Sequence, residues 1–210
     1  LDDERNHLFK DFLRVVSSLK PKAVLIENVP GIISLGQGTV VQQIYAELET
    51  LGYKVKHKIL FAGHYGIPQM RFRTIFIGIR EYKGEIVFPE PEFDAKAVAN
   101  FTGAKELCIS TPPLFYPDLK PQVNVWAALS DLPEIENSQT TSPDRYSCIE
   151  QNDYQKYLRN KCTKLTAHYC AKVAEVNLER LKYIPQGGSW RDIPHDLLPN
   201  GLKRARRSDH

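Results

Sequence analysis

The chain has 210 residues, of which 42% are hydrophobic, and a formal net charge of +3 at pH 7. This composition suffices for one large domain or for one domain with a smaller companion. The sequence holds no run of about 18 apolar residues and does not begin with the basic and apolar segments of a secretory signal. Neither a membrane span nor secretion is indicated, so we expect a cytoplasmic protein. The small excess of basic residues permits a polyanionic partner without requiring one.

The four cysteines lie in the second half of the chain and form no CxxC pair. This scatter favours reduced thiols over a disulfide framework. Cys162, His168 and Cys170 are close in sequence, but their spacing differs from that of familiar zinc sites. We therefore expect no metal site.

Two amphipathic helices are predicted in the first 80 residues. The apolar positions of residues 8–19 recur with a spacing of three and four, an N-terminal aspartate can cap this helix, and Lys20-Pro21 ends it. Thr39 opens a second helix with a capping box, and Gly52 is placed to end it.

Three strands are predicted beside these helices. Residues 23–26 form a short continuous apolar run, which is typical of a central parallel strand covered on both faces. Residues 53–61 alternate apolar side chains with lysines, and a last strand is predicted from about Phe72 to Arg80, after a turn rich in glycine and proline. The alternation of helices and strands predicts an α/β fold.

The composition of the sequence changes after Glu81. Prolines punctuate residues 88–121, which predicts extended connections and a domain boundary near residues 85–120. A short helix is predicted at residues 126–132 and a longer one at residues 165–184, with a polar loop before it. The basic run at residues 203–207 is explained as well by a frayed end as by a phosphate contact.

Glu27 stands where the apolar run of residues 23–26 stops. In parallel α/β sheets, ligand sites collect at the carboxyl ends of the strands, so Glu27 is a candidate site residue. The alternative is that Glu27 caps a helix or pairs with a surface lysine.

Two arginines follow about forty residues later. On a strand, Gln69, Arg71 and Arg73 would share one face with the isoleucines of residues 75–79, in line with a buried apolar row. Such guanidinium groups need carbonyl or anionic partners, and together with Glu27 they could grip the polar edge of a small planar ring. A structural ion pair with Glu27 or an N-terminal aspartate explains the spacing equally well.

Three blocks carry a family resemblance. They are Asp3-Glu4-Arg5-Asn6-His7-Leu8, Glu27-Asn28-Val29-Pro30-Gly31 and Tyr65-Gly66-Ile67-Pro68-Gln69-Met70-Arg71-Phe72-Arg73. In order and separation they resemble the D-x-R-x-x-L, ENV and Q-x-R-x-R blocks of the DNA (cytosine-5) methyltransferases. Residues 124–133 are similar to the segment that opens the target-recognition region in many bacterial members.

The resemblance implies an enzyme that transfers a methyl group from S-adenosylmethionine to carbon 5 of a cytosine swung out of the duplex. By the match, Glu27 would hold N3 and the exocyclic amine of the base, Arg73 would donate to its O2, and Arg71 would brace the pair. Leu8 matches a position that lies against the cofactor. Four further residues match supporting positions of the pocket, namely Arg5, Asn28, Val29 and Gln69.

For the fold, the resemblance implies the C-terminal half of a Rossmann-like methyltransferase sheet in residues 1–85. A proline-rich connection in residues 86–120 and a smaller, irregular α+β target-recognition domain in residues 121–210 would follow. The family's Pro-Cys-Gln nucleophile block and its glycine-rich cofactor loop do not occur in the sequence. We therefore expect a segment that is inactive alone. Its expected partners are double-stranded DNA and an N-terminal part of the same bacterial, nucleoid-associated restriction-modification enzyme.

Two other functions remain open. A non-catalytic DNA-binding or regulatory relative could keep the same scaffold, although it would have no need of Glu27, Arg71 and Arg73. The second open function is that of a tRNA cytosine methyltransferase. The long region after Glu81 suits DNA target recognition better but does not exclude RNA.

Overall fold

A computed structural model describes residues 6–96 and 118–207 of the chain. The chain divides into two compact units, Leu1–Ala128 and Leu129–His210. Ile86, Phe88 and Ala95 are buried, so part of the expected connection belongs to the packed structure of the first unit. The limits 1–85, 86–120 and 121–210 stay a prediction about functional domains.

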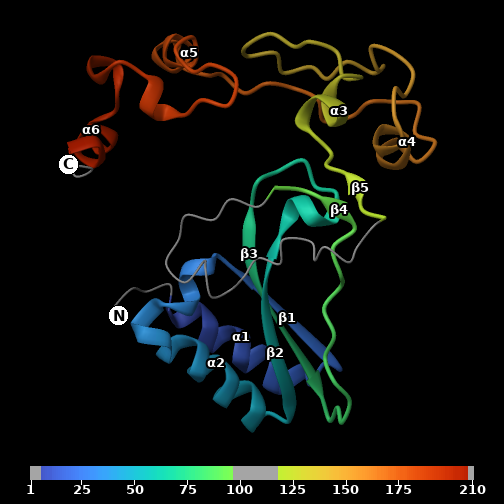
Figure 1. The fold of residues 1–210 in the computed structure, drawn as a ribbon, viewed down its shortest axis with the longest axis vertical. Helices are drawn as coiled ribbons and strands as arrows, with labels where there is room; N and C mark the ends of the chain where they lie inside the picture. The colour runs from blue at the N-terminus through green and yellow to red at the C-terminus, as the bar shows by residue number, and fades with distance from the viewer. Residues whose placement is uncertain (1–5, 97–117, 208–210) are drawn as a thin grey trace. The chain divides into compact units, whose positions relative to one another are not determined.

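A three-stranded antiparallel sheet forms the centre of the first unit (Figure 1). Its strands are β1 (Ala23–Asn28), β2 (Tyr53–Phe61) and β3 (Phe72–Arg80), in the order β1-β3-β2. The predicted spans of β2 and β3 are confirmed, and in β2 the alternation of apolar residues with lysines marks a strand that is covered on one face.

The prediction for β1 is wrong in two respects. This strand pairs antiparallel with β3, and the side chain of Leu25 is 62% exposed. An apolar run of four residues indicates burial but carries no information about the direction of the neighbouring strand. Here the β2–β3 hairpin inserts β3 beside β1 with the opposite direction.

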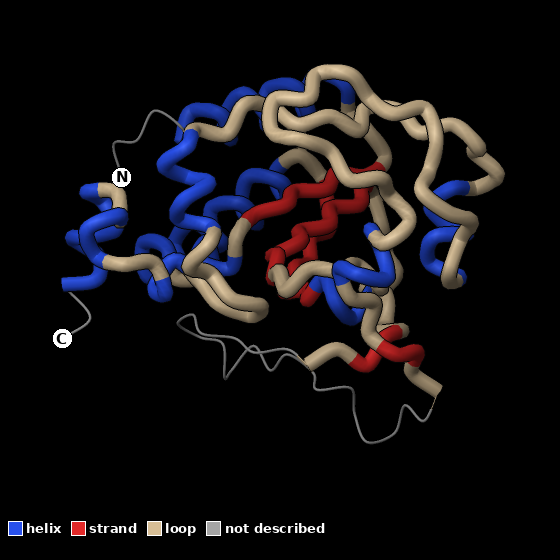
Figure 2. Tube along the Cα trace, turned by 90° about the horizontal axis from the view of Figure 1, so that it is seen from above, coloured by secondary structure: helices blue, strands red, loops and turns tan. Residues whose placement is uncertain are grey.

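Two helices cover one face of this sheet, as Figures 1 and 2 show. They are α1 (Asn6–Leu19) and α2 (Thr39–Thr50). Val16, Ile44 and Leu48 from the helices pack with buried residues of the strands. The strand residues of this core are Val24, Tyr53, Val55 and Phe76. The amphipathic pattern is therefore confirmed at these positions, whereas Leu8 and Leu19 near the ends of α1 are 67% and 73% exposed.

The start of α2 differs from the predicted capping box. Gly38 is the N-cap residue, and no side chain caps the helix there. The Thr39 hydroxyl instead donates to the carbonyl of Gly36 at 2.8 Å. A preceding 3-10 helix, η2 (Leu35–Gly38), supplies this acceptor one turn earlier. Gly52 has a φ of +84°, as expected for the residue that ends the helix.

Short elements connect the longer ones in the first unit. The 3-10 helix η1 (Pro30–Ile33) follows β1, and η3 (Ala62–Tyr65) joins β2 to the loop before β3. A small parallel pair is formed by β4 (Phe93–Asp94) and β5 (Lys120–Pro121). The amide of Glu92 donates to the carbonyl of His64 at 2.9 Å, which fixes the start of β4 beside η3.

The second unit consists of short helices and long irregular segments (Figure 1). The helix α3 (Val125–Leu129) leads into it, and α4 (Asp153–Arg159), α5 (Glu175–Leu181) and α6 (Asn200–Arg207) follow. Two 3-10 helices, η4 (Trp190–Asp192) and η5 (His195–Leu197), lie between α5 and α6. In the part of the chain that the structure describes, no helix is both long and apolar enough to cross a membrane.

The long helix predicted at residues 165–184 is wrong over its first half, since only Glu175–Leu181 is helical. Distant loop carbonyls accept the backbone amides that a helix would use. Leu165 donates to Asp144 at 3.0 Å and Cys170 donates to Gln139 at 2.9 Å, while Ala167 has a φ of +58°. These contacts are long-range, so periodicity could not reveal them.

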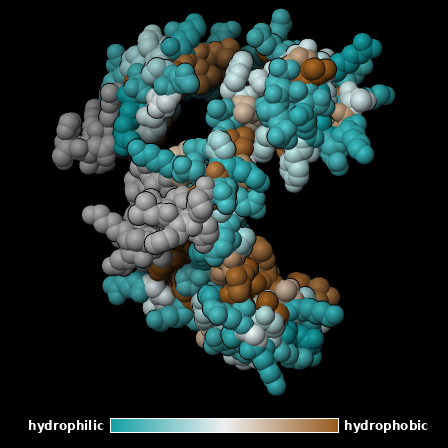
Figure 3. Space-filling model, turned by 45° about the vertical axis from the view of Figure 1, so that its right-hand side comes forward, coloured by the Kyte–Doolittle hydropathy of each residue, from teal (hydrophilic) through white to brown (hydrophobic). Residues whose placement is uncertain are grey.

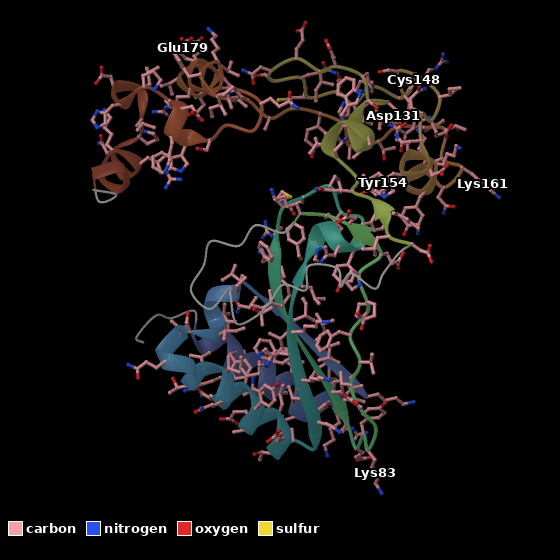
Figure 4. All side chains as sticks on the ribbon, viewed as in Figure 1. Lys83, Asp131, Cys148, Tyr154, Lys161 and Glu179 are labelled. Carbon is pink, nitrogen blue, oxygen red and sulfur yellow. The ribbon has the colours of Figure 1, made fainter. Side chains whose placement is uncertain are left out.

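A buried polar cluster holds the loop around Cys148 to α4. Arg159 donates to Asp131 at 2.8 Å and to the Cys148 carbonyl at 2.7 Å, and its guanidinium carbon lies 3.6 Å from the centre of the Tyr146 ring. Gln155, which is 1% exposed, donates to the Ser130 hydroxyl at 2.9 Å. Figure 4 shows Asp131 just after α3 and Cys148 in the loop that this cluster anchors.

Candidate active site

The structure brings Glu27 and Arg73 together as an ion pair between Glu27 Oε1 and Arg73 Nε. Their strands place them there. Glu27 of β1 is opposite Ile75 of β3, and Arg73 lies two residues before Ile75 and therefore on the same face. The sheet therefore joins two catalytic candidates that are far apart in sequence.

The two partners differ in exposure. The side chain of Arg73 is 19% exposed and that of Glu27 is 52% exposed. A further nitrogen of Arg73, Nη1, donates to the carbonyl of Phe72 at 2.8 Å. The contact between Nε and Glu27 lacks hydrogen-bond geometry, which leaves Nε without a directed acceptor. Because water screens Glu27, we expect the pair to add little to stability.

Hydrophobic residues share this face of the sheet. Ile75 and Ile77 are partly buried, Leu25 is largely exposed, and the two helices lie on the opposite face. Exposed hydrophobic residues are drawn in brown in the space-filling view of Figure 3. A carboxylate and a guanidinium thus meet at the end of an apolar row, as the sequence predicted for Arg73 and Ile75.

The prediction that Gln69 and Arg71 continue this row is wrong. Both residues precede β3, and both are exposed. Backbone hydrogen bonds explain the break. The amide of Arg71 donates to the carbonyl of Gln69, and the carbonyl of Arg71 accepts from the amide of Ala62 at 2.8 Å, which closes a turn before the strand begins. Strand alternation therefore does not apply to these two residues.

The remaining predicted residues lie on either side of the sheet end. Asn28 is partly buried and its Oδ1 accepts from the amide of Val29 at 2.8 Å, which supports the turn after β1. The side chain of Val29 is 53% exposed. Leu8 is 67% exposed on α1, so contacts to a ligand are open to it. Arg5 lies outside the described residues.

Sequence reasoning missed Lys58, which the register places on the same face as Glu27 and Arg73. The alternation of apolar residues and lysines in β2 already contained this information. In residues 8–96 and 118–203, no group of three His, Cys, Asp or Glu side chains could hold a metal ion.

Gly66 shapes the loop that carries the third block, Tyr65 to Arg73. Its φ is +76°, and a Cβ added there would lie 2.7 Å from the Phe93 ring. We predict that Gly66→Ala lowers the free energy of unfolding by about 1–3 kcal/mol, because backbone strain and a ring clash add up. Urea unfolding measures the change. Gly31→Ala is the control, since a Cβ at Gly31 meets nothing within 4 Å. Equal effects of the two substitutions would show that strain and the contact with Phe93 do not cause the loss of stability.

His64 is buried behind this loop, with Nε2 3.1 Å from the carbonyl of Ala95. Burial lowers the pKa of His64, and the hydrogen bond to Ala95 opposes this shift. A lowered pKa means that the unfolded chain binds the proton more readily. The contribution of His64 to the free energy of unfolding is therefore full above the pKa of histidine in the unfolded chain, about 6.5, and is lost as the pH falls below that value. Burial shifts the pKa of His57 in the same direction.

We therefore predict that the free energy of unfolding drops between pH 7.5 and pH 5.5, and that His64→Gln makes the drop smaller. Urea unfolding of both forms at the two pH values tests this. A drop of the same size in His64→Gln would show that His64 does not contribute to it.

Comparison with known proteins gives a consistent result. The family model for the C-5 cytosine-specific DNA methylases matches residues 1–193. The type II methyltransferase M.AgeI of Thalassovita gelatinovora is 31% identical over 205 residues, which cover 96% of this chain and 46% of that protein. The type II methyltransferase M1.HphI of Haemophilus parahaemolyticus is 50% identical over 90 residues, which cover 43% of this chain and 24% of that protein.

A plant protein and a crystal structure extend the comparison. The DNA (cytosine-5)-methyltransferase 2 of Arabidopsis thaliana is 32% identical over 91% of this chain, which corresponds to 13% of its own length. A structure assigned to a DNA modification methyltransferase of an E. coli prophage has a TM-score of 0.52 and 26% identity, covering 75% of this chain and 40% of that one. This chain spans less than half the length of these relatives. By the extent of the family match, the chain belongs to the C-5 cytosine-specific DNA methylases.

Proposed function

We propose that this chain carries the cytosine-binding part of an enzyme that methylates carbon 5 of cytosine in double-stranded DNA. The observation that carries the proposal is the Glu27–Arg73 pair, which presents an acceptor and a fixed cation on one face at the ends of β1 and β3. A cytosine offers N3, the exocyclic amine and O2 along one edge. A carboxyl group can bind the first two, and a guanidinium group can donate to the third.

Glu27 has the central role in this proposal. A thiolate that adds to carbon 6 of the ring pushes electrons toward N3 and O2, so a proton held at N3 by Glu27 lowers the barrier. Arg73 then donates to O2, where negative charge grows. Because Glu27 is half-exposed, a bound base can reach its carboxyl group. The proton on carbon 5 leaves after methylation, and elimination of the thiol restores the aromatic ring.

Arg71 and Gln69 have supporting roles. Both are exposed on the turn next to Arg73, so they can contact a bound nucleotide or a further part of the enzyme without disturbing the core. Asn28 and Val29 hold the turn after Glu27. S-adenosylmethionine supplies the methyl group when it is bound, and the exposed side chain of Leu8 suits an apolar contact with it.

We further propose that an N-terminal part of the enzyme supplies the thiol nucleophile and most of the cofactor site. The matched residues cover only 46% and 24% of two of its relatives, so each relative has a long part outside the match, which supports the proposal. Residues 1–85 would then form the C-terminal half of a Rossmann-like sheet. Residues 121–210 would contribute to target recognition, since long irregular segments on a polar scaffold offer side chains to base edges.

Analysis of the methylated product tests the proposal. A complete enzyme that contains this chain is incubated with labelled S-adenosylmethionine and, separately, with mixed-sequence duplex DNA and with tRNA, and the labelled nucleosides are identified. We expect 5-methylcytosine in the DNA. Label in tRNA alone would replace the DNA function by RNA modification. Duplex binding with no label in either substrate would favour a regulatory DNA-binding relative.

A further inference from the structure

Three lysines of β2 lie on the same face of the sheet as Glu27 and Arg73. The register pairs Lys54 with Ile79, Lys56 with Ile77 and Lys58 with Ile75 of β3. Opposite residues of neighbouring strands project to the same side, so these lysines face away from the helices. A row of cations therefore runs along the sheet toward the candidate active site.

The segment after β3 uses two of these lysines. Lys54 donates to the carbonyl of Gly84 at 2.7 Å, and Lys56 pairs with Glu85 at 3.0 Å. Further along, the hydroxyl of Tyr65 donates to the carbonyl of Pro89 at 3.0 Å. The segment thus contacts β2 before Lys58 and η3 after it, and it runs in the direction of the active site.

Lys58 has no such partner. Its side chain is partly buried, and within residues 8–96 and 118–203 it makes no hydrogen bond or ion pair. An ammonium group that has no anion beside it is free to bind one from a ligand or from another part of the enzyme. Of the three lysines, Lys58 is therefore the one whose ammonium group has no partner among the described residues.

The position of Lys58 relates it to the proposed cytosine pocket. Glu27, Ile75 and Lys58 lie at the same level of the three strands, and Arg73 is a diagonal neighbour of both Glu27 and Lys58. Diagonal neighbours of this kind are about 7–8 Å apart. Glu27 already pairs with Arg73, so the group of three carries one positive charge that is not balanced.

We propose that Lys58 binds a backbone phosphate next to the target cytosine. This rests on the proposed function, because one edge of the base must bind Glu27 and Arg73 for its phosphate to approach Lys58. A phosphate is separated from its base by one sugar, which matches a cation one diagonal position from Arg73. A phosphate contact carries no sequence information, so Lys58 would position the nucleotide without selecting it.

The salt dependence of DNA binding tests this assignment. Affinity for duplex DNA is measured at several salt concentrations for a complete enzyme that contains this chain, with Lys58 and with Lys58→Met. We expect the slope of log K against log salt to lose about 0.9, which is the value for one phosphate contact, and to the same extent on target and unrelated sequences. Lys58→Arg should restore the slope, because it keeps the charge and the reach.

Lys54→Met is the matched control. Lys54 belongs to the same row, but Gly84 holds its ammonium group, about 13 Å further along the strand from the proposed phosphate. We expect no change in its slope. An unchanged slope in Lys58→Met would overturn the inference, whether or not methylation falls, and would point to a carboxylate of the enzyme as the partner. Failure of the unsubstituted enzyme to methylate cytosine would instead refute the proposed function.

Discussion

Replacing Glu27 by glutamine is expected to reduce the turnover of a complete enzyme that contains this chain by about 10²- to 10⁴-fold, the usual contribution of a general acid. Glutamine keeps the shape of glutamate, but it cannot hold a proton at N3 of the base. Affinity for duplex DNA should stay nearly the same, because contacts to phosphates dominate it. Single-turnover methylation and DNA binding, measured on the same preparation, separate the two effects.

Arg73→Ala provides the companion test. It removes the donor to O2 and should also lower turnover, with the largest effect on the step in which the thiolate adds. Since Glu27 is half-exposed, the unfolding free energy should change little in Glu27→Gln. Near-normal turnover in Glu27→Gln would exclude the acid role. Unfolding of both variants would instead identify the contact as a structural ion pair.

Arg159→Met is expected to destabilise the second unit by about 3–5 kcal/mol, the largest effect on stability that we predict. The side chains of Arg159 and Asp131 are 8% and 4% exposed. Loss of the arginine leaves the Asp131 carboxylate buried without its cation. It also removes the hydrogen bond to Cys148 and the stacking on Tyr146, so the loop before α4 loses its anchor. Urea unfolding followed by circular dichroism measures the change.

Lys156→Met is the matched control on the same helix. Lys156 pairs with Asp153 at 3.0 Å, but both side chains are largely exposed. Such a pair contributes at most about 1 kcal/mol. If Arg159→Met costs no more than Lys156→Met, the buried cluster does not hold the second unit together.

The elements that the sequence predicted well are those with a regular local pattern. The alternation in β2 and the spacing in α1 and α2 reflect a single covered face, so the pattern and the structure agree closely. The direction of β1 depends on β3, which is about fifty residues later. The region before α5 depends on hydrogen bonds to a loop about twenty to thirty residues earlier. Local patterns contain neither kind of information.

Some residues of the candidate site could also be predicted from local sequence patterns, and others could not. Glu27 at a strand end and Arg73 in line with isoleucines could be inferred from sequence, and the pairing was one of two interpretations that the spacing allowed. Arg71 could not be placed, because the turn at residues 69–71 is set by a backbone bond to Ala62. The helix α4 was missed because its N-cap, Asn152, and its buried Gln155 and Arg159 look like exposed polar residues until their partners are known.

We propose that Glu27 and Arg73 form the cytosine pocket of a methyltransferase whose nucleophile lies in another part of the enzyme. Methyl transfer from labelled S-adenosylmethionine to mixed-sequence DNA tests it most directly, with this chain alone and with this chain plus an N-terminal part that contains the nucleophile. We expect activity only in the combined sample, and loss of that activity with Glu27→Gln. Activity of this chain alone, or full activity of the combined sample with Glu27→Gln, would contradict it.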